Sequence, residues 1–360
     1  MELVDVIKAF LPDEQLLFCK PLGNGHINST YAVETDRNIY SLQEINTNIF
    51  KNVDGLMSNI DKVTEHIKKK AEARGENSHR VTLNFLPCPA TGKMFALAEN
   101  RAYRMYEFID DVFTIEVMSN PTDFYSAGLG FGKFAKELID FDASQLVETI
   151  VNFHNTASRY LDFEKAINFN YNNRAASVEN EIAFVKARKD FMSLFVDKLD
   201  SGELPLRVTH NDTKINNILF DQKTGAPAAV IDLDTVMPGT YLYDFGDAIR
   251  SGATHAAEDE QDLSKVDFDL GLYEQFTKGY LEACGDSLTP IEIEMLPYSS
   301  IMLTLECGMR FLTDHLNGDT YFKVHRENHN LDRARTQFKL VDEMENHFEE
   351  MKSIINKYSN

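Results

Sequence analysis

Three polar residues in one short stretch have the types and spacing of a loop that transfers a phosphoryl group. His210, Asp212 and Asn217 stand at offsets 0, 2 and 7. In such loops the Asp orients or deprotonates the acceptor hydroxyl and the Asn holds Mg²⁺. We predict that Asp212 orients or deprotonates the acceptor hydroxyl and that Asn217 binds the metal, while Lys214 could lie over the γ-phosphate. His210 is expected to be a packed loop residue.

A second pair of carboxylates follows this loop. Asn217 to Phe220 and Ala228 to Leu233 are typical of a two-stranded hairpin with polar residues at its ends. Asp232, at the end of its apolar strand, is predicted to be the second Mg²⁺ ligand. Asp234 is either a further metal ligand or a group that supports the ligands.

The sequence Asp244-Phe245-Gly246 matches the usual metal-binding motif of kinases, but its place in the chain argues against that role. Asp232 follows the hairpin directly, whereas Asp244 comes after a further Pro238-Gly239 turn. We therefore expect Asp244 to be a structural anchor that accepts backbone N–H bonds from the catalytic loop.

Nucleotide-binding residues are expected near the N-terminus. Gly25 and Asn28 belong to a glycine turn whose backbone N–H groups could approach phosphates. Gln43 stands where kinases place the lysine that binds the α- and β-phosphates, so a positive charge is missing there. Adenine is expected near Glu107 and Ile109, and the nucleotide is expected to be ATP.

The chain resembles the aminoglycoside phosphotransferase and choline kinase superfamily. More narrowly, it is similar over nearly its whole length to the bacterial N-acetylhexosamine 1-kinases. Six segments carry this closer resemblance: Gly25–Asn28, Phe141–Leu146, Leu206–Lys214, Ile231–Thr235, Tyr243–Asp247 and Glu306–Phe311. The resemblance implies transfer from ATP, with Mg²⁺, to the anomeric hydroxyl of N-acetylglucosamine or N-acetylgalactosamine.

Acceptor-binding residues are expected in the C-terminal part. Glu306 and Arg310 are four apart on a predicted helix, so they could form an ion pair or bind hydroxyl groups and an amide carbonyl. The resemblance favours sugar contacts for Arg310 and Tyr321, and also for Arg250. Other acceptors remain open: an aminoglycoside, choline, homoserine or another hexose. A nucleotide-binding pseudokinase is a further alternative, to which the Gln43 departure points.

The elements that must position these residues change in type along the chain. Strands are predicted at 16–21, 29–35, 38–44, 84–86, 94–98 and 101–108, with one helix at 53–74. Helices are predicted from Pro121 and at 144–156, 177–199, 271–284, 290–315 and 331–357. The resemblance implies an α+β, bilobal protein-kinase-like fold. We place a small β-rich nucleotide-binding lobe at 1–109 and a larger, mainly helical catalytic lobe at 110–360.

Composition excludes several classes of protein. The 360 residues include 57 Asp and Glu against 36 Lys and Arg, a net charge of −21 that repels nucleic acid and anionic lipid. No apolar run is long enough to cross a bilayer, and four dispersed cysteines fit reduced thiols. We expect a cytoplasmic protein, a monomer or weak homo-oligomer, whose partners are ATP and a small sugar.

Overall fold

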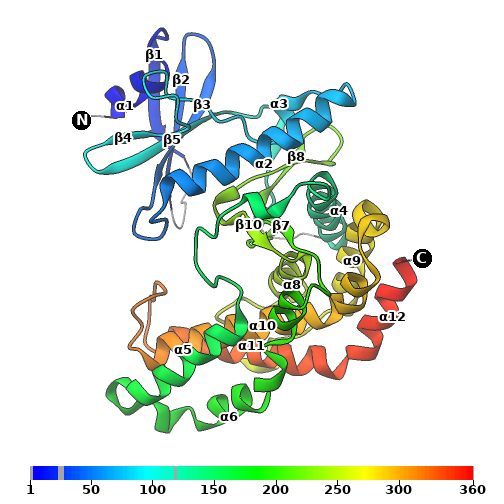
Figure 1. Ribbon diagram of the computed structural model, residues 1–360. Coiled ribbons are helices and arrows are strands. Elements are labelled where there is room, and N and C mark those ends of the chain that lie inside the picture. Colours follow the sequence, from blue (N-terminus) through cyan, green and yellow to red (C-terminus); the bar gives the residue numbers. More distant parts are fainter. Residues whose placement is uncertain (1–2, 23–27, 117–119, 360) are drawn as a thin grey trace. The chain divides into compact units, whose positions relative to one another are not determined.

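The computed structural model describes residues 3–22, 28–116 and 120–359, and its contacts divide the chain into two compact units (Figure 1). Unit 1 comprises Met1–Phe113, Asp140–Val151 and Leu219–Met237. Unit 2 comprises Thr114–Ile139, Asn152–Ile218 and Pro238–Asn360. The α+β fold class, with a β-sheet in the N-terminal region and a larger helical part, is confirmed. The single lobe boundary after residue 109 stays a prediction.

Unit 1 is built on a five-stranded antiparallel sheet in the order β1-β2-β3-β5-β4. Its strands are β1 (Leu16–Pro21), β2 (Ser29–Thr35), β3 (Ile39–Ile45), β4 (Ala96–Ala98) and β5 (Arg101–Glu107). The central strands β3 and β5 pair so that Gln43 lies opposite Arg104. This register places a cation beside the residue that occupies the expected lysine position.

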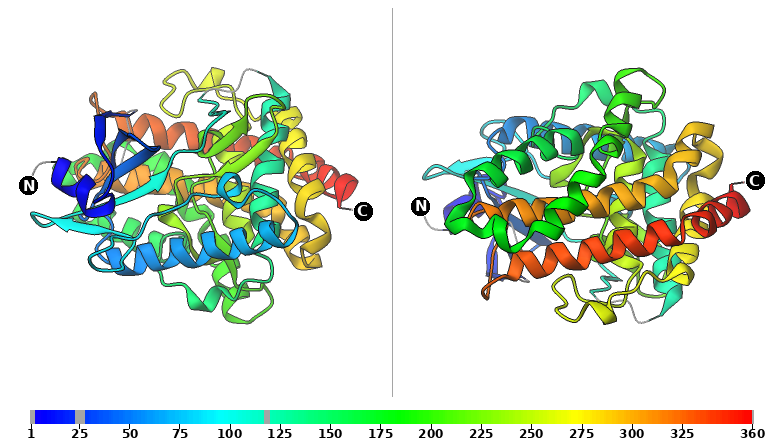
Figure 2. Two further views of the ribbon diagram at one scale, coloured as in Figure 1. Left: turned by 90° about the horizontal axis from the view of Figure 1, so that it is seen from above. Right: turned by 90° about the horizontal axis from the view of Figure 1, so that it is seen from below.

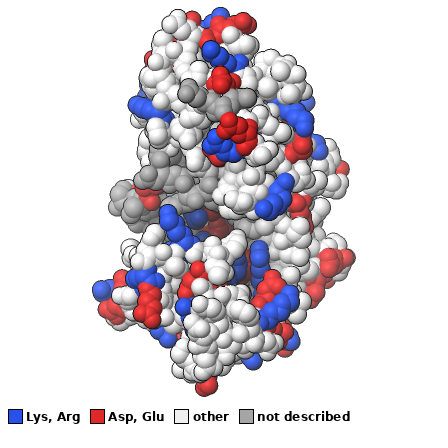
Figure 3. Space-filling view, turned by 90° about the vertical axis from the view of Figure 1, so that its left-hand side faces the viewer, with Lys and Arg blue, Asp and Glu red and all other residues white. Residues whose placement is uncertain are grey.

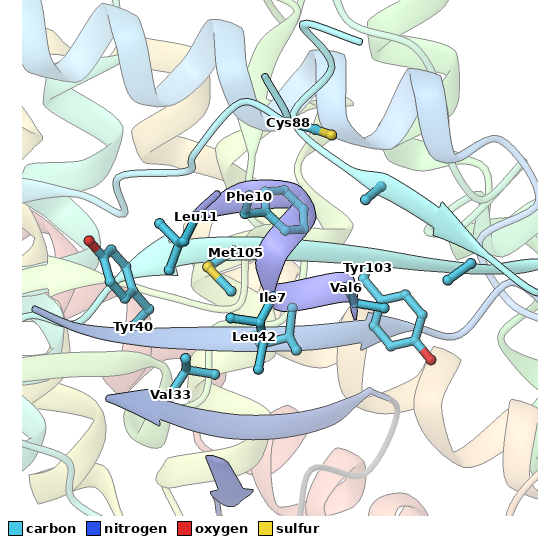
Figure 4. Close-up of a cluster of buried hydrophobic side chains, with 12 residues drawn as sticks. Val6, Ile7, Phe10, Leu11, Val33, Tyr40, Leu42, Cys88, Tyr103 and Met105 are labelled. Carbon is cyan, nitrogen blue, oxygen red and sulfur yellow. The ribbon is translucent and has the colours of Figure 1, made fainter. Parts of the chain in front are cut away.

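One face of this sheet is covered by a short helix that the sequence analysis did not predict, α1 (Leu3–Phe10). Its apolar residues pack against the sheet residues Leu42 and Met105, both fully buried (Figure 4). Because strand residues alternate between faces, Leu42 and Gln43 point to opposite sides of β3. The apolar core therefore lies on the face away from Gln43.

The other elements of unit 1 include the predicted long helix and hairpin. They are α2 (Val53–Ala73), α3 (Ser78–Val81), β6 (Val112–Phe113), η1 (Ala143–Gln145), β8 (Ile218–Asp221), β9 (Pro227–Val230) and η5 (Leu233–Thr235). Strands β6, β8 and β9 form a second sheet. The side chain of Asn59 on α2 donates to the carbonyl oxygens of Val147 and Val236. These bonds join the three separate stretches of unit 1.

Unit 2 is mainly helical. Its helices are α4 (Pro121–Glu137), α5 (Thr156–Phe169), α6 (Glu179–Ala187), α7 (Leu194–Asp200), α8 (Tyr241–Gly252), α9 (Leu270–Cys284), α10 (Pro290–Leu316), α11 (His329–Asn346) and α12 (Phe348–Tyr358). Short 3₁₀ segments are η2 (Tyr171–Ser177), η3 (Lys189–Phe191), η4 (Ile215–Asn217), η6 (Leu263–Lys265) and η7 (Gly285–Ser287). Strand β7 (Arg207–Thr209) pairs with β10 (Met237–Gly239).

Two helix pairs form the core of unit 2. Helices α4 and α9 pack closely, and a Cβ at Gly128 would lie 2.3 Å from the carbonyl oxygen of Phe276. Gly128 and Gly132 therefore allow the close packing of α4 against α9. Helix α10 runs beside α11 and also contacts α8 and α5 (Figure 2). Its long buried face holds Glu306, and Arg310 follows one turn later.

Several predicted helices differ from those observed. No helix spans 144–156, because the Asn155 side chain accepts the N–H of Ser158 and starts α5 at Thr156. The predicted helix 177–199 is broken into α6, η3 and α7, and the helix 331–357 is broken at His347. Helix α8 was also not predicted, although its polar residues Asp244, Asp247 and Arg250 recur at helical spacing.

Among the described residues, no helix is both long enough and apolar enough to cross a membrane.

Candidate active site

The catalytic loop follows β7 and is held in place by a carboxylate on α8. Asp244 accepts the backbone N–H of His210 at 2.9 Å and that of Asn211 at 2.7 Å. Asn211 has a φ of 65°, the left-handed conformation that Asn tolerates better than most residues. The prediction that Asp244 anchors this loop is confirmed. Burial raises the pKa of Asp244 to about 6, so the carboxylate is ionised at neutral pH.

A second carboxylate, one turn later on α8, holds the next part of the loop. Asp247 accepts the N–H of Thr213 at 2.9 Å. Burial acts to raise the pKa of Asp247, but Arg250 and Lys214 outweigh it and lower this pKa. Two Arg250 nitrogens donate to Asp247, and a third donates to Glu258 at 3.3 Å. The buried Arg250, predicted to contact the acceptor, is thus engaged with carboxylates of its own unit.

Asp212 presents a partly exposed carboxylate between an amide and an ammonium group. Its side chain is 29% exposed, and Lys214 Nζ lies 2.9 Å from its Oδ1. Asn217 Nδ2 donates to the carbonyl oxygen of Asp212 and to its Oδ2. Burial acts to lower the pKa of Lys214, but Asp212 and Asp247 more than offset this and raise it, so the ammonium stays charged. The loop thus brings together three residues predicted from spacing.

His210 is a packed loop residue, as its position suggested. It is fully buried, and its ring meets the rings of Phe131 and Phe134 edge-on. The backbone N–H of Asp212 donates to His210 Nδ1 at 3.3 Å. The imidazole therefore supports the loop conformation.

In unit 1, Asp234 lies in a buried ionic cluster. Arg104 on β5 forms an ion pair with it, and the Asn28 side chain donates to its other oxygen. Burial acts to lower the pKa of Arg104, but Asp234 more than offsets this and holds it above its usual value. Both oxygens of Asp234 are thus engaged, which favours the supporting role over that of a metal ligand.

The other residues of unit 1 that were predicted to bind the nucleotide do not share one set of contacts. Gln43 Oε1 accepts from Arg104 Nε at 2.9 Å, and Gln43 Nε2 donates to Thr30. Glu107 lies 2.7 Å from the ring of the exposed His79, and Ile109 is buried. Gly25 lies outside the described residues. Gln43 therefore orients the Arg104 guanidinium, a cation that the sequence analysis missed.

The two predicted metal ligands offer oxygen atoms, which suit a hard cation such as Mg²⁺. Because Asn217 Nδ2 donates to Asp212, its Oδ1 is the side-chain atom that can bind a cation. Asp232 has an exposed side chain and a left-handed backbone with φ 57° at the start of η5. The side-chain oxygen atoms of Asn217 and Asp232 are therefore suitable ligands for Mg²⁺.

Glu306, predicted to contact the acceptor, is instead buried within unit 2. Its oxygens lie 2.8 Å from His154 Nδ1 and 2.6 Å from the Thr156 hydroxyl. His154 Nε2 lies 3.5 Å from the carbonyl oxygen of Asn211. Burial acts to raise the pKa of Glu306, but His154 outweighs it and lowers this pKa. Glu306 and His154 thus connect α10 to the residue that precedes Asp212.

Arg310 and Tyr321 line a cavity of about 420 Å³ in unit 2. Its wall is formed by residues of α5, the C-terminal part of α10 and the segment after it: Arg159, Asp162, Lys165, Ala166, Phe169, Arg310, Thr313, Asp314, Asn317, Thr320, Tyr321 and Phe322. The side chains of Phe169 and Tyr321 are about two-thirds exposed. The cavity therefore combines aromatic faces with polar groups, a composition that suits a small polar ligand.

The residues that the sequence analysis missed are charged or polar groups on regular elements. Arg104 occupies an interior strand position, where a charged residue needs a partner and is itself a signal. His154 lies in a turn two residues before α5, and Arg159 lies in the first turn of α5. The position of this helix was predicted wrongly. The role of Arg159 could be recognised only once α5 and α10 were placed together.

The chain is similar to known phosphotransferases in sequence and in structure. Residues 133–279 match the model of the phosphotransferase enzyme family. An aminoglycoside phosphotransferase from Alicyclobacillus acidocaldarius is similar in structure, with a TM-score of 0.64 at 10% identity over 99% of this chain and 97% of that one. A microcompartment-associated aminopropanol kinase has a TM-score of 0.58 at 15% identity, over 97% of this chain and 98% of that one.

A choline kinase from Streptococcus pneumoniae gives a TM-score of 0.51 at 13% identity, over 96% of this chain and 99% of that one. At these identities the solved structures establish the fold. Together with the family match, they support the aminoglycoside phosphotransferase and choline kinase superfamily. The match covers Asp212 and Asn217, the two loop residues chosen for chemistry.

Proposed function

We propose that this protein is an ATP- and Mg²⁺-dependent kinase that phosphorylates the anomeric hydroxyl of an N-acetylhexosamine. The observation that carries the proposal is the Asp212 carboxylate, which lies between Lys214 and Asn217 on a loop anchored by two α8 carboxylates. A carboxylate held in this way can align an attacking hydroxyl without rearranging. The family match supports the phosphotransferase class.

The mechanism is a direct in-line transfer. Asp212 accepts the proton of the acceptor hydroxyl while the oxygen–phosphorus bond forms and the bond between the γ-phosphorus and the bridging oxygen breaks, which releases ADP. Lys214 offsets negative charge on the γ-phosphoryl group. Asn217 and Asp232 would hold Mg²⁺, which neutralises charge on the phosphates when bound. No phosphoenzyme is needed.

Nucleotide binding is assigned to unit 1. Two structural neighbours, a spectinomycin phosphotransferase and an aminoglycoside phosphotransferase, were solved with ADP. Asn28, Glu107 and Ile109 keep the nucleotide-binding roles that the sequence suggested, together with the glycine turn at Gly25, whereas Gln43 orients Arg104. Arg104 supplies the positive charge that Gln43 lacks.

The acetamido sugar is supported by the resemblance and by the composition of the cavity. Arg310 can donate to an amide carbonyl, and the exposed rings of Phe169 and Tyr321 offer faces to a sugar ring. Glu306 contributes by holding His154 rather than by direct contact, and Arg250 by holding Asp247. The pseudokinase alternative is disfavoured because Asp212, Asn217 and Asp232 are all present.

The test is an ADP-release assay with ATP and Mg²⁺ across N-acetylglucosamine, N-acetylgalactosamine, glucose, galactose, choline and kanamycin, with phosphorus NMR of each product. We expect turnover with the N-acetylhexosamines and a phosphorus signal coupled to the anomeric proton. The Asp212→Asn variant is the matched control for contaminating kinases. Turnover with choline or kanamycin alone would overturn the sugar, and no turnover with any acceptor would count against the kinase.

A further inference from the structure

The cavity in unit 2 has an unusual balance of charge for an acidic protein. Figure 3 shows acidic and basic residues interspersed over the face that it views, against a net charge of −21. In the cavity wall, however, both carboxylates, Asp162 and Asp314, already have partners within the protein. Asp162 forms an ion pair with Lys165 at 2.8 Å. The buried Asp314 accepts the backbone N–H groups of Thr320, Tyr321 and Phe322.

Two guanidinium groups remain in the wall. Arg159 reaches it from α5, and Arg310 from α10. In the part of the chain that the structure describes, neither of them forms an ion pair with a carboxylate. The cavity wall therefore holds three cations, Arg159, Arg310 and Lys165, against two carboxylates, Asp162 and Asp314. The buried Glu306 lies behind this wall, close enough to interact with both guanidinium groups.

Both guanidinium groups are held in position by Phe153. Arg159 Nε and Nη2 donate to its carbonyl oxygen at 3.3 and 3.1 Å. Arg310 lies over its ring, and also over that of Phe322, at 5.6 Å from each ring centre. Burial and the nearby charge of Arg310 lower the pKa of Arg159. A ligand with an electron-rich oxygen would reduce the electrostatic repulsion between these two guanidinium groups.

A series of contacts within unit 2 connects the cavity wall to the catalytic loop. Arg310 follows Glu306 by one helical turn, and Glu306 contacts His154, the residue after Phe153. His154 in turn lies 3.5 Å from the carbonyl oxygen of Asn211, which precedes Asp212. These contacts link the cavity wall to the loop that carries the proposed base.

Building on the proposed kinase function, we infer that Arg159 is a specificity-determining residue: with Arg310 it makes the acceptor cavity electropositive, so that the cavity takes acceptors with a carbonyl or anionic oxygen and rejects cations. An amide carbonyl accepts hydrogen bonds from a guanidinium, whereas an ammonium group would be placed against two positive charges. This selectivity is opposite to what a cationic acceptor such as choline requires.

The test compares N-acetylglucosamine with glucosamine, which differ by one acetyl group and, below neutral pH, by one positive charge. We expect wild-type kcat/KM to favour the acetamido sugar by at least about tenfold. Arg159→Glu should reduce this ratio about tenfold or more and should raise turnover of choline. Lys133→Glu, at an exposed position on α4, makes the same change in net charge and should leave the ratio unaltered.

Direct binding by calorimetry without nucleotide separates this inference from the proposed function. If wild-type protein binds N-acetylglucosamine more tightly than glucosamine but turns over neither, the kinase proposal fails and the charge selectivity stands. Equal affinity for the two sugars, no binding of either, or the same shift in Lys133→Glu as in Arg159→Glu would overturn the inference. Should Arg159→Glu not fold, Arg159→Gln replaces it, with about half the change in the logarithm of the ratio.

Discussion

Each of the two units holds an aspartate beside a cation, and the two pairs differ mainly in exposure. In unit 2, Asp212 and Lys214 have side chains that are 29% and 48% exposed. In unit 1, Asp234 and Arg104 have side chains that are 5% and 2% exposed. An exposed pair can exchange its partner for a substrate at little cost, whereas a buried pair loses a great deal when it is separated. The comparison therefore supports the proposal that Asp212 takes part in the chemistry and that Asp234 has a positioning role.

The two pairs also differ in how they are held. The loop that carries Asp212 is anchored through backbone N–H groups that donate to Asp244 and Asp247. Asp234 is held through side chains, by Arg104 and Asn28. Backbone anchoring leaves the Asp212 side chain available, while side-chain anchoring uses both oxygens of Asp234. A carboxylate that must accept a proton benefits from the first arrangement.

The largest effect is expected when the exposed pair loses its carboxylate. Asp212→Asn keeps the size of the side chain but removes the proton acceptor, so turnover should fall about 10²- to 10⁴-fold. The melting temperature should change little, because the loop is held by its backbone. Turnover is measured by ADP release and melting by circular dichroism. Activity within a factor of ten of wild type would refute the assignment of chemistry to Asp212.

Breaking the buried pair should act on stability instead. Arg104→Met leaves the Asp234 carboxylate buried without its cation, which should cost about 3–5 kcal/mol in the free energy of unfolding. Urea denaturation measures this loss, and the KM for ATP should rise because unit 1 also loses its buried cation. The double variant Arg104→Met with Asp234→Asn should recover part of the stability.

A surface ion pair serves as the matched control. Lys93 lies 2.6 Å from Asp54, and both side chains are at least half exposed. Lys93→Ala should cost no more than about 1 kcal/mol. If Arg104→Met lowers the free energy of unfolding as little as Lys93→Ala does, the buried pair of Arg104 and Asp234 does not position unit 1.

The difference between the two pairs also explains what the sequence could predict. Asp212, Lys214 and Asn217 lie within six positions, so their spacing is visible in the sequence and predicted that they share one site. The partners of Asp234 are 130 and 206 residues away along the chain. Contacts at such separations arise only from the register of β3 and β5 and leave no local pattern, so Arg104 was missed.

The same reasoning applies to the fold. The strands β1 to β5 and the long helices α2, α9 and α10 have clear periodicity, and the sequence predicted them within one or two residues. The strand predicted at 84–86 is wrong, since only an isolated bridge joins Phe85 to Tyr106, and β6 was not predicted. Helix α5 was placed too early because its start depends on one side-chain hydrogen bond from Ser158 to Asn155. This error hid Arg159, since the helix that carries it was not expected there.

Asp244, which anchors the loop that carries Asp212, should make the free energy of unfolding depend on pH. Asp244 has a pKa of about 6 in the folded protein because of burial, above its ordinary value of 3.8. Between these two values the folded state binds more protons at Asp244 than the unfolded state does. Its contribution to stability therefore falls as pH rises from about 4 to 6, by about 3 kcal/mol in total.

The measurement compares the unfolding free energies of wild type and Asp244→Asn across this range. The variant cannot titrate at this position, so the difference, wild type minus variant, should decrease as pH rises and level off above about pH 6. Subtracting the variant removes the contributions of other carboxylates. A difference that stays constant with pH would show that Asp244 is not buried as a charge in the folded state.

The smallest effect concerns Gln43, where the sequence and the structure suggest different roles. If Gln43 binds the nucleotide directly, Gln43→Ala should raise the KM for ATP at least about tenfold with little change in stability. If it serves mainly to orient Arg104, the variant should lose about 1.5–3 kcal/mol of unfolding free energy, since one hydrogen bond to a charged group is removed. We expect the second outcome, with a change in KM below about threefold, because Arg104 keeps its ion pair with Asp234. Parallel urea denaturation and ATP titration of the same preparation distinguish the two roles, and the first outcome would return the phosphate-binding position to Gln43.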